Sequence, residues 1–580
     1  MAKKKNENTL SYLQMPLPSG SKYSKMTKVA FGGLNKRYTL DSGDLTMESN
    51  ISTKEYPYLT PSEYKEKYFG KYSIPIGMFA FDDFCIVIYK LRNVKYTEES
   101  KTWVQDEIKI DYIVYDEEND KYTKYTSLVG VDEKTTNMTD EQYAEYVEEQ
   151  RCIVQFNKYD ESEDIINGSY VKKLLIFPDK KSMNFEITEN NFEIQDMHVD
   201  IKTYTNDTDP FLPPDTASHN HYYLNIGTEA AKSIKTDYGK GIFRWVDDEV
   251  DSENSGWKIS IPPTMPNIKY ATVHLSRLFG VSDNCVYASG FNDYTNWSLD
   301  STGEYNESNS WFSQTQSNTK AGGDFTGITT FDGHVVCFKR DFMHEIYNTK
   351  NPFRLQDIYA EGCIDNRTIQ DVDGKLIFVS EDDVKIYTGS NPRIIGYNLN
   401  MSQYEYAVSG TDNRNYYLYC EDKIGNKYLY VYDTFTELWS EQNITNRVIN
   451  FAHNKNGMYM LCDDGYVSKM DTGIYDHEWS FETDLITNKT VNIKHIKKLQ
   501  MLVDIAKSAN MRVYILYDDE VFDENTSHLV YSSNKNGRVP IRVKPRKTAN
   551  YGFKLHFEGT GYVKLYELEI FIEAGGDMYV

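Results

Sequence analysis

Four turn signals recur at a nearly constant spacing in the second half of this chain. They are separated by 41, 41 and 42 residues, and an apolar run follows each of them. A period of about 40–45 residues with several short strands per repeat is typical of the blades of a β-propeller. We therefore predict an all-β chain with an irregular propeller of roughly six to eight blades. The turns lie at Gly333, Gly374, Asn415 and Gly457.

Asp-Gly and Asn-Gly dipeptides form three of these turns. They occur at Asp332-Gly333, Asp373-Gly374 and Asn456-Gly457. Both dipeptides adopt the positive φ angles of a tight type I′ hairpin. The repeats hold no chemical motif, so we expect function in the segments that depart from the period.

The composition along the chain divides it into three parts. Residues 1–60 are polar and irregular at first, which predicts an extended arm followed by a first strand. Residues 61–478 form the predicted propeller. Residues 479–580 contain alternating strands and turn signals, which predict a separate β-sandwich.

Two capping signals predict short helices. A charged insertion at 132–150 contains a capping box formed by Thr139 and Gln142, which predicts one exposed helix. Thr60 and Pro61, followed by a glutamate, have the same pattern and predict a short helix where the propeller begins.

Two further insertions are predicted to be long loops. The stretch 205–222 is rich in proline and contains His219 and His221, for which we favour a solvated loop over a metal site because other ligands are missing. The stretch 296–324 carries large aromatic residues, which suggests that it docks onto another subunit. We add three lysines of the N-terminal arm to these aromatic residues as interface candidates. The candidates are Lys3, Lys4, Lys5, Trp297, Trp311 and Phe312.

The formal net charge of −24 is unevenly distributed. Residues 481–580 contain 14 basic and 13 acidic residues, so the first 480 residues carry a charge of about −25. Tight binding of nucleic-acid phosphates requires clustered Lys and Arg, which an acidic body lacks. An acidic wall past which DNA slides without binding is compatible with this charge.

Cysteine usage and hydropathy indicate where the chain is made. The seven cysteines are scattered, and the closest two are 26 residues apart, so no metal or redox spacing occurs. The N-terminus lacks the apolar core of a signal peptide, and no apolar run reaches the roughly 20 residues of a membrane span. We therefore predict synthesis in a reducing cytoplasm and no membrane span.

Sequence motifs for catalysis are absent. A P-loop, an H-E-x-x-H motif and a serine nucleophile elbow do not occur. The acidic clusters at 381–383 and 463–464 suit a glycosidase pair or a Ca²⁺ site, but they fall at expected turns, where Asp is favoured. We predict no catalytic residue, no metal ligand, no cofactor and no enzymatic activity.

Three stretches carry motifs beyond the repeats. The first is Phe31-Gly-Gly-Leu-Asn35 with Tyr56-Pro57-Tyr-Leu59, the second runs from Arg277 through Asp293-Tyr-Thr-Asn-Trp-Ser298 to Gly362-Cys363, and the third joins Trp479-Ser-Phe-Glu482 to Glu558-Gly-Thr-Gly561. Together they resemble the tail hub or nozzle proteins of tailed bacteriophages, in which a propeller is followed by a sandwich. The resemblance covers most of the chain except 132–150 and 205–222.

The resemblance implies a structural protein located in the virion tail. It implies a ring, a homohexamer, that surrounds the DNA exit channel and connects the portal–adaptor region to distal tail parts. Double-stranded DNA would pass through the ring without sequence recognition during ejection. These partners and this location follow from the resemblance and not from the repeat.

Three classes of function stay open at this point. The first is the structural tail component, the second is a virion-borne propeller that binds a carbohydrate or receptor on Tyr and Trp platforms, and the third is a propeller hydrolase with paired carboxylates. We favour the first because the N-terminal arm and the Trp-bearing insertion gain order most readily against neighbouring subunits.

Overall fold

A computed structural model of the chain forms two compact units. Unit 1 comprises Met1–Leu91, Tyr112–Thr123 and Arg367–Val580, and unit 2 comprises Arg92–Asp111 and Lys124–Asn366. The structure describes residues 13–574 except 16–22, 29–30, 38–43, 64, 99–100, 117–120, 161–168, 188–191, 198–243, 247–257, 261–264, 298–308, 315–322, 360, 401–403, 491, 519, 534–535 and 547.

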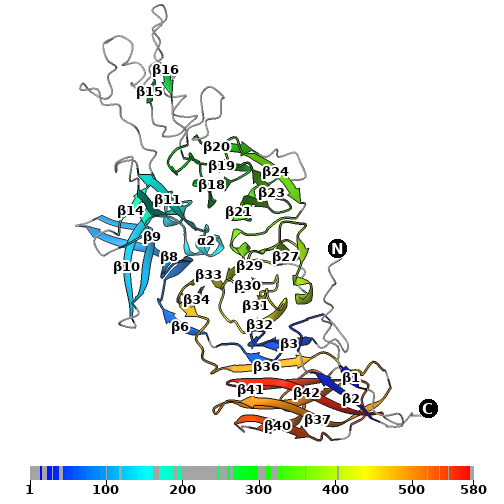
Figure 1. Cartoon of the computed structure of the whole chain (residues 1–580). Coiled ribbons are helices and arrows are strands. Elements are labelled where there is room, and N and C mark those ends of the chain that lie inside the picture. The colour runs from blue at the N-terminus through cyan, green and yellow to red at the C-terminus, as the bar shows by residue number, and fades with distance from the viewer. Residues whose placement is uncertain are drawn as a thin grey trace, which may run out of the picture. The chain divides into compact units, whose positions relative to one another are not determined.

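Unit 2 contains three antiparallel sheets of four strands, each formed by strands that are consecutive in the chain (Figure 1). The first sheet is β11 (Cys152–Asp160), β12 (Ser169–Phe177), β13 (Lys181–Asn184) and β14 (Ile194–Asp196). The second is β17 (Tyr270–His274), β18 (Arg277–Ser282), β19 (Cys285–Ala288) and β20 (Trp311–Gln314). The third is β21 (Phe325–Phe331), β22 (His334–Lys339), β23 (Met343–Tyr347) and β24 (Arg354–Tyr359), and a short hairpin pairs β15 (Arg244–Val246) with β16 (Lys258–Ser260).

The three sheets of unit 2 pack face to face. Phe156 and Leu175 of the first sheet share a buried cluster with Leu278 of the second. Phe279 of the second sheet shares another cluster with Val335 of the third. Stacking of consecutive four-stranded sheets is the arrangement of propeller blades.

Unit 1 continues the same pattern. Its sheets are β25 (Gln370–Asp371), β26 (Leu376–Val379), β27 (Val384–Tyr387) and β28 (Arg393–Ile394), then β29 (Tyr406–Thr411), β30 (Asn415–Glu421), β31 (Lys427–Asp433) and β32 (Leu438–Gln442). A third sheet joins β33 (Val448–Asn454), β34 (Gly457–Cys462) and β35 (Val467–Lys469) to β6 (Glu66–Phe69) from the start of the chain. A further sheet, whose residues are divided between the two units, has the order β10-β9-β8-β7 and is formed by β7 (Ile74–Phe81), β8 (Phe84–Glu98), β9 (Lys101–Asp116) and β10 (Lys121–Val131).

The remaining strands of unit 1 form a sandwich of two five-stranded sheets. One sheet has the order β1 (Leu13–Met15), β2 (Tyr23–Lys28), β42 (Val563–Ala574), β37 (Lys494–Ile505) and β40 (Gly537–Val543). The other has the order β3 (Leu45–Ser49), β36 (Glu478–Thr483), β41 (Phe553–Thr560), β38 (Asn510–Tyr517) and β39 (His528–Ser533). After β3 in the chain, β4 (Ile51–Ser52) and β5 (Thr60–Pro61) form a separate two-stranded sheet. Leu499, Val513, Phe557 and Ile570 are among the fully buried residues of the core.

These sheets confirm the predicted fold class, an all-β chain with propeller-type sheets and a C-terminal β-sandwich. Seven sheets of four strands occur in the described part of the chain. The predicted number of blades in a closed ring stays a prediction.

The N-terminal segment is more than an arm. β2 pairs with β42, and β3 pairs with β36, so residues from the predicted arm complete both sheets of the sandwich. The predicted helix at Thr60 is wrong, because Thr60 and Pro61 form β5 and pair with β4. Burial of both residues in a strand pair outweighs the local capping signal.

The predicted helix in 132–150 is two short helices. α1 spans Glu133–Thr136 and α2 spans Asp140–Glu145, and the capping box of Thr139 and Gln142 is present. Asp132, whose side chain accepts hydrogen bonds from the first turn of α1, caps that helix separately. No helix in the described residues is long and apolar enough to cross a membrane.

The four repeating turns connect the first two strands of four successive sheets. Asp332-Gly333 and Asp373-Gly374 have positive φ at both residues, as a type I′ hairpin requires. The turn near Asn415 lies instead at 412–414, and Asp412 accepts hydrogen bonds from the backbone N–H groups of Arg414 and Asn415. Gly457 has a φ of 137° and is the first residue of β34, so this turn is not type I′.

Candidate functional site

The first of the three motif stretches joins the sandwich to a propeller-type sheet within unit 1. A Cβ atom on Gly33 would lie 2.5 Å from the carbonyl oxygen of Trp439 in β32, and the Leu34 N–H donates to that oxygen at 2.8 Å. The side chain of Asn35 donates to Asp44, and Phe31 is buried in the sandwich core. Only glycine permits this approach, so the motif serves as a joint.

The second stretch forms a compact corner in unit 2. The Arg277 guanidinium donates to the carbonyl oxygens of Ser289 and Asn309, at 2.6 and 2.7 Å, and burial lowers the pKa of Arg277 to about 10. Asp293 accepts hydrogen bonds from the backbone and hydroxyl of Thr295. A Cβ atom on Gly362 would lie about 2.1 Å from a backbone oxygen, so this glycine also permits a close approach.

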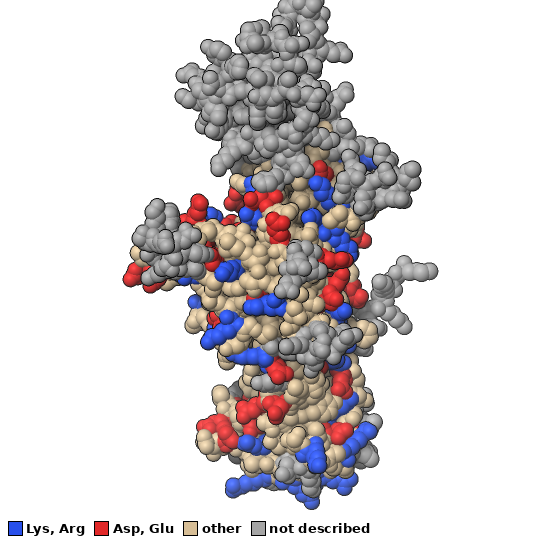
Figure 2. Space-filling view, turned by 90° about the vertical axis from the view of Figure 1, so that its left-hand side faces the viewer, with Lys and Arg blue, Asp and Glu red and all other residues tan. Residues whose placement is uncertain are grey.

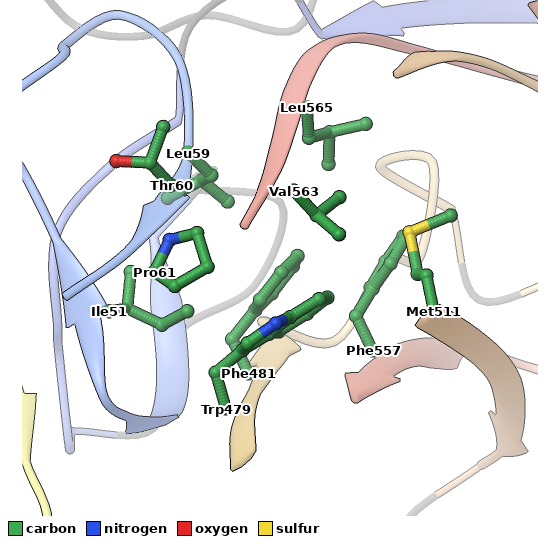
Figure 3. Close-up of a pocket in the computed structure, with 10 residues that line it drawn as sticks. All are labelled: Ile51, Leu59, Thr60, Pro61, Trp479, Phe481, Met511, Phe557, Val563 and Leu565. Atoms are coloured by element: carbon green, nitrogen blue, oxygen red, sulfur yellow. The ribbon is translucent and has the colours of Figure 1, made fainter. Parts of the chain in front are cut away.

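The third stretch stabilises the sandwich. The Trp479 indole N–H donates to the carbonyl oxygen of Gly561 at 2.9 Å, and a Cβ atom on Gly559 would lie 2.6 Å from the Trp479 ring. Figure 3 shows Trp479 and Phe481 beside Pro61 and Phe557, around a cavity of about 10 Å³. A cavity of this size is part of the packed core and holds no ligand larger than a water.

The interface candidates differ in exposure. Trp297 is 4% exposed and Trp311 is 5% exposed, and both belong to buried clusters of unit 2, so we reassign the two tryptophans from docking to the core. Their large apolar area is more stable between sheets than in water. Phe312 points the other way along β20 and is 50% exposed, so its role as a contact stays a prediction. Lys3, Lys4 and Lys5 lie outside the described residues, as does the predicted loop 205–222.

Residues of the two acidic clusters form hydrogen bonds and an ion pair within the fold. Asp383 accepts a hydrogen bond from the Val384 N–H. Asp463 accepts one from the Arg447 N–H, and Asp464 pairs with Lys67 at 2.8 Å. Asp383 and Asp464 each accept a hydrogen bond within their own turn, Asp464 from the Tyr466 N–H, whereas the contacts to Arg447 and Lys67 link separate segments. Among the described residues no group of three or more His, Cys, Asp and Glu side chains could hold a metal.

A buried histidine, His556, lies between two glutamates and a phenylalanine on the outer face of one sandwich sheet. The Nδ1 atom of His556 lies 3.2 Å from Glu482, its Nε2 atom lies 3.7 Å from Glu558, and its ring stacks on Phe522 at 3.6 Å. The imidazole is only 1% exposed. A ligand cannot reach it beneath Phe522, so we interpret the cluster as a stabilising network.

A polar hollow in unit 2 is the best candidate for a binding site. On one face of the first sheet, Phe156, Leu175 and Phe177 contribute to the buried core. Further along the same face the apolar residues give way to Lys158 and Lys173, which line the hollow. The lysines lie on neighbouring strands, diagonally opposite each other, because Phe156 pairs with Lys173 and Lys158 with Val171.

The hollow has a volume of about 680 Å³. Lys173 donates to Asn184 at 2.6 Å, and Lys158 lies 3.9 Å from Asp293 and 5.6 Å from the Tyr294 ring. Burial and the neighbouring charge of Lys158 lower the pKa of Lys173. The other lining residues are Val171, Ser182, Glu193, Ile194, Gln195, Asp196, Met197, Tyr294 and Thr295.

One local feature of the sequence points to this hollow. In the strand around Val171-Lys-Lys-Leu, two adjacent lysines must point to opposite faces, so one of them enters the packed side. The contribution of Tyr294, more than 120 residues away, has no local signal. We predicted a sugar-binding alternative from aromatic composition alone.

Comparison with known proteins finds solved structures that are distantly similar to this chain. Neither a protein-family model nor a curated protein sequence matches the chain. A glycoside hydrolase family 43 arabinoxylan arabinofuranohydrolase from Bacillus subtilis is similar with 8% identity, over 87% of this chain and 96% of that chain, at a TM-score of 0.19. A Trypanosoma rangeli sialidase is similar with 8% identity, over 87% of this chain and 92% of that chain, at a TM-score of 0.24.

These similar structures correct one prediction. We predicted no enzymatic activity, whereas the similar structures are glycoside hydrolases, so this prediction is contradicted and we withdraw it. TM-scores of 0.19 and 0.24 assign neither an activity nor a catalytic residue to this chain.

Proposed function

We propose that the chain is a structural protein of a bacteriophage tail, a hub or nozzle subunit that assembles into a ring. The observation that carries the proposal is the structural role of the three motif stretches. Gly33, Arg277 and Trp479 each make close backbone contacts that join elements of the fold. The residues that carry the resemblance to a structural family therefore stabilise the fold of this chain.

The charge distribution supports association of identical copies. Residues 537–546, which contain edge strand β40, include no acidic residue, and Arg538, Arg542, Lys544 and Arg546 are exposed. Figure 2 shows Lys and Arg side chains at the lower end of the visible face, where Figure 1 places β40. The first 480 residues carry a charge of about −25, so a basic edge on one copy is complementary to acidic surface on the next. Such unlike surfaces form head-to-tail contacts, which give a ring when the rotation between neighbouring copies closes and an open filament when it does not.

Electron microscopy tests this proposal. Purified full-length protein is imaged in negative stain, and particles of a phage that encodes it are labelled with an antibody against the chain. We expect rings in the first sample and label on the tail axis in the second. Label on peripheral fibres would contradict the hub and favour the receptor-binding alternative.

A further inference from the structure

We propose that a row of three cations at the edge of the sandwich binds the acidic segment 247–253 of a second copy of this chain. The row, called the basic row below, consists of Arg542 at the end of β40 and of Lys544 and Arg546 just beyond it. The acidic segment follows β15 in the sequence and lies outside the described residues. This contact rests on the proposed function, in which identical copies assemble, and it names the two surfaces that meet.

The basic row has no acidic partner in the described part of its own chain. Its three residues are exposed, and none of their side chains forms a hydrogen bond or an ion pair with a described residue. Gln500, which is neutral, lies opposite Arg542 in the ladder, and Glu569 on the next strand already pairs with Lys25. The three cations therefore repel one another without compensation by a described carboxylate.

The basic row follows the period of an extended strand. From Pro540 to Arg546, exposed residues alternate with more buried ones. Alternate side chains of an extended chain point to the same side, about 6.8 Å apart, which is twice the rise of roughly 3.4 Å per residue. Arg538 continues the same side of β40, but Asp504 lies opposite it, so we leave it out of the row.

The acidic segment has the same period. It carries four acidic residues at successive alternate positions, a pattern that occurs nowhere else in the sequence, and residues 247–257 contain no Lys or Arg. The four are Asp247, Glu249, Asp251 and Glu253. Bound in an extended conformation, the segment would place three carboxylates opposite the three cations at matching spacing. Such pairs gain charge-assisted hydrogen bonds, which arginine can form in a bidentate manner.

Spacing separates this segment from the other acidic runs of the chain. Residues 160–164 contain four acidic residues, but no more than two of them stand at successive alternate positions. Net charge without spacing would let either run bind the basic row equally well. Matched spacing selects 247–253, so a change in the order of its residues should weaken binding even though the charge is the same.

A peptide tests the contact without requiring a ring. A fluorescent peptide with the sequence of residues 246–254 is titrated with the full chain and followed by anisotropy. The control peptide has the same composition, with its five acidic residues placed side by side. We expect the native order to bind about tenfold or more tightly than the control peptide.

Variants of the full chain locate the site of the peptide. The double change Lys544→Gln with Arg546→Gln should weaken binding of the native peptide by about tenfold or more. The double change Lys423→Gln with Lys507→Gln is the matched control, because both lysines are exposed and lie outside the basic row. The control is expected to bind the peptide like the unmodified chain.

Charge reversal tests the contact between copies. One variant reverses the basic row, with Arg542→Glu, Lys544→Glu and Arg546→Glu. A second variant reverses the acidic segment, with Glu249→Lys, Asp251→Lys and Glu253→Lys. We expect each variant by itself to lose assembly in sedimentation velocity, and an equimolar mixture to recover it, because every reversed surface then meets its opposite on the other chain.

A matched control for the second variant reverses the run at 160–164, with Glu161→Lys, Glu163→Lys and Asp164→Lys. This control should assemble like the unmodified chain. Assembly that survives both reversals of the contact, or a mixture that does not recover, would overturn the contact and leave the ring itself standing.

The peptide titration separates the contact from the proposed function. An unmodified chain that forms no ring would contradict the proposed function, and the titration would then decide the contact by itself. Equal binding of the two peptides, no binding of the native peptide, or equal losses in both double variants would each overturn the contact.

Discussion

Single residues hold the joint between the sandwich and β32. Replacing Gly33 by alanine places a Cβ atom 2.5 Å from the Trp439 carbonyl oxygen, which also accepts the Leu34 N–H. We expect Gly33→Ala to destabilise unit 1 by about 1–3 kcal/mol, as overpacking against backbone does. Thermal unfolding followed by tryptophan fluorescence measures this. Gly130→Ala is the control, because an added Cβ there meets nothing within 4 Å, and equal losses from both changes would contradict the joint.

A buried lysine makes the stability of the sandwich dependent on pH. Burial lowers the pKa of Lys28 to about 8, although Asp484 and Asp44 oppose the shift. The unfolded chain binds this proton up to its ordinary pKa of about 10.5, so the lysine costs stability below pH 8 and that cost disappears as the pH rises. The free energy of unfolding should gain up to about 3 kcal/mol from this group between pH 7 and 10.5.

Urea titrations at neutral and alkaline pH measure this gain against Lys28→Met. The unmodified chain should become more stable relative to the variant as the pH rises. A Lys25→Met variant in the same strand controls for the loss of a lysine. A difference between the unmodified chain and Lys28→Met that is independent of pH would contradict the expected titration.

At the scale of elements, β6 completes a sheet from the far end of the chain. It pairs with β35 through Val467, and the ring of Phe69 lies 5.3 Å from Tyr122 and 6.2 Å from Tyr459. Phe69→Ala should remove this anchor and let β6 detach. Hydrogen exchange should then accelerate at the β35 amides, while Glu66→Ala, at an exposed position, should leave them protected. Unchanged exchange in Phe69→Ala would show that backbone pairing alone holds the strand.

The elements that the sequence predicted are those with local signals. Asp332-Gly333 and Asp373-Gly374 form the expected hairpins because both residues tolerate positive φ. The equivalent turn at Leu275-Ser276 also has positive φ at both residues but contains no glycine, so the sequence did not reveal it. The pairing of β2 with β42 was not predictable either, because strands separated by more than 500 residues leave no local pattern.

Candidate-site residues follow the same rule. Trp297 and Trp311 suggest a contact with another subunit because they stand out in a polar stretch of sequence. In the structure, both side chains are buried in the core. The hollow was missed because its lysines and Tyr294 come from segments far apart in the chain. Periodicity predicts a strand and its buried face, whereas a site between sheets depends on tertiary packing.

At the scale of the whole molecule, uneven charge predicts how copies associate. If the basic residues of β40 contact acidic surface on another copy, salt should weaken assembly, since the Debye length falls to roughly 3 Å at about 1 M. We expect the ring to dissociate as salt is raised, and the double change Arg538→Glu with Arg542→Glu to prevent assembly even at low salt. Sedimentation velocity at several protein concentrations measures both effects.

The matched control for this charge reversal is Lys507→Glu. Lys507 is exposed between β37 and β38 and carries the same charge, but it lies outside β40. Each protein is first checked for an unchanged thermal midpoint, so that a loss of assembly reports on the interface. Assembly that resists high salt and survives the β40 double change would place the contact on apolar surface instead, with the exposed Phe312 as the next residue to replace.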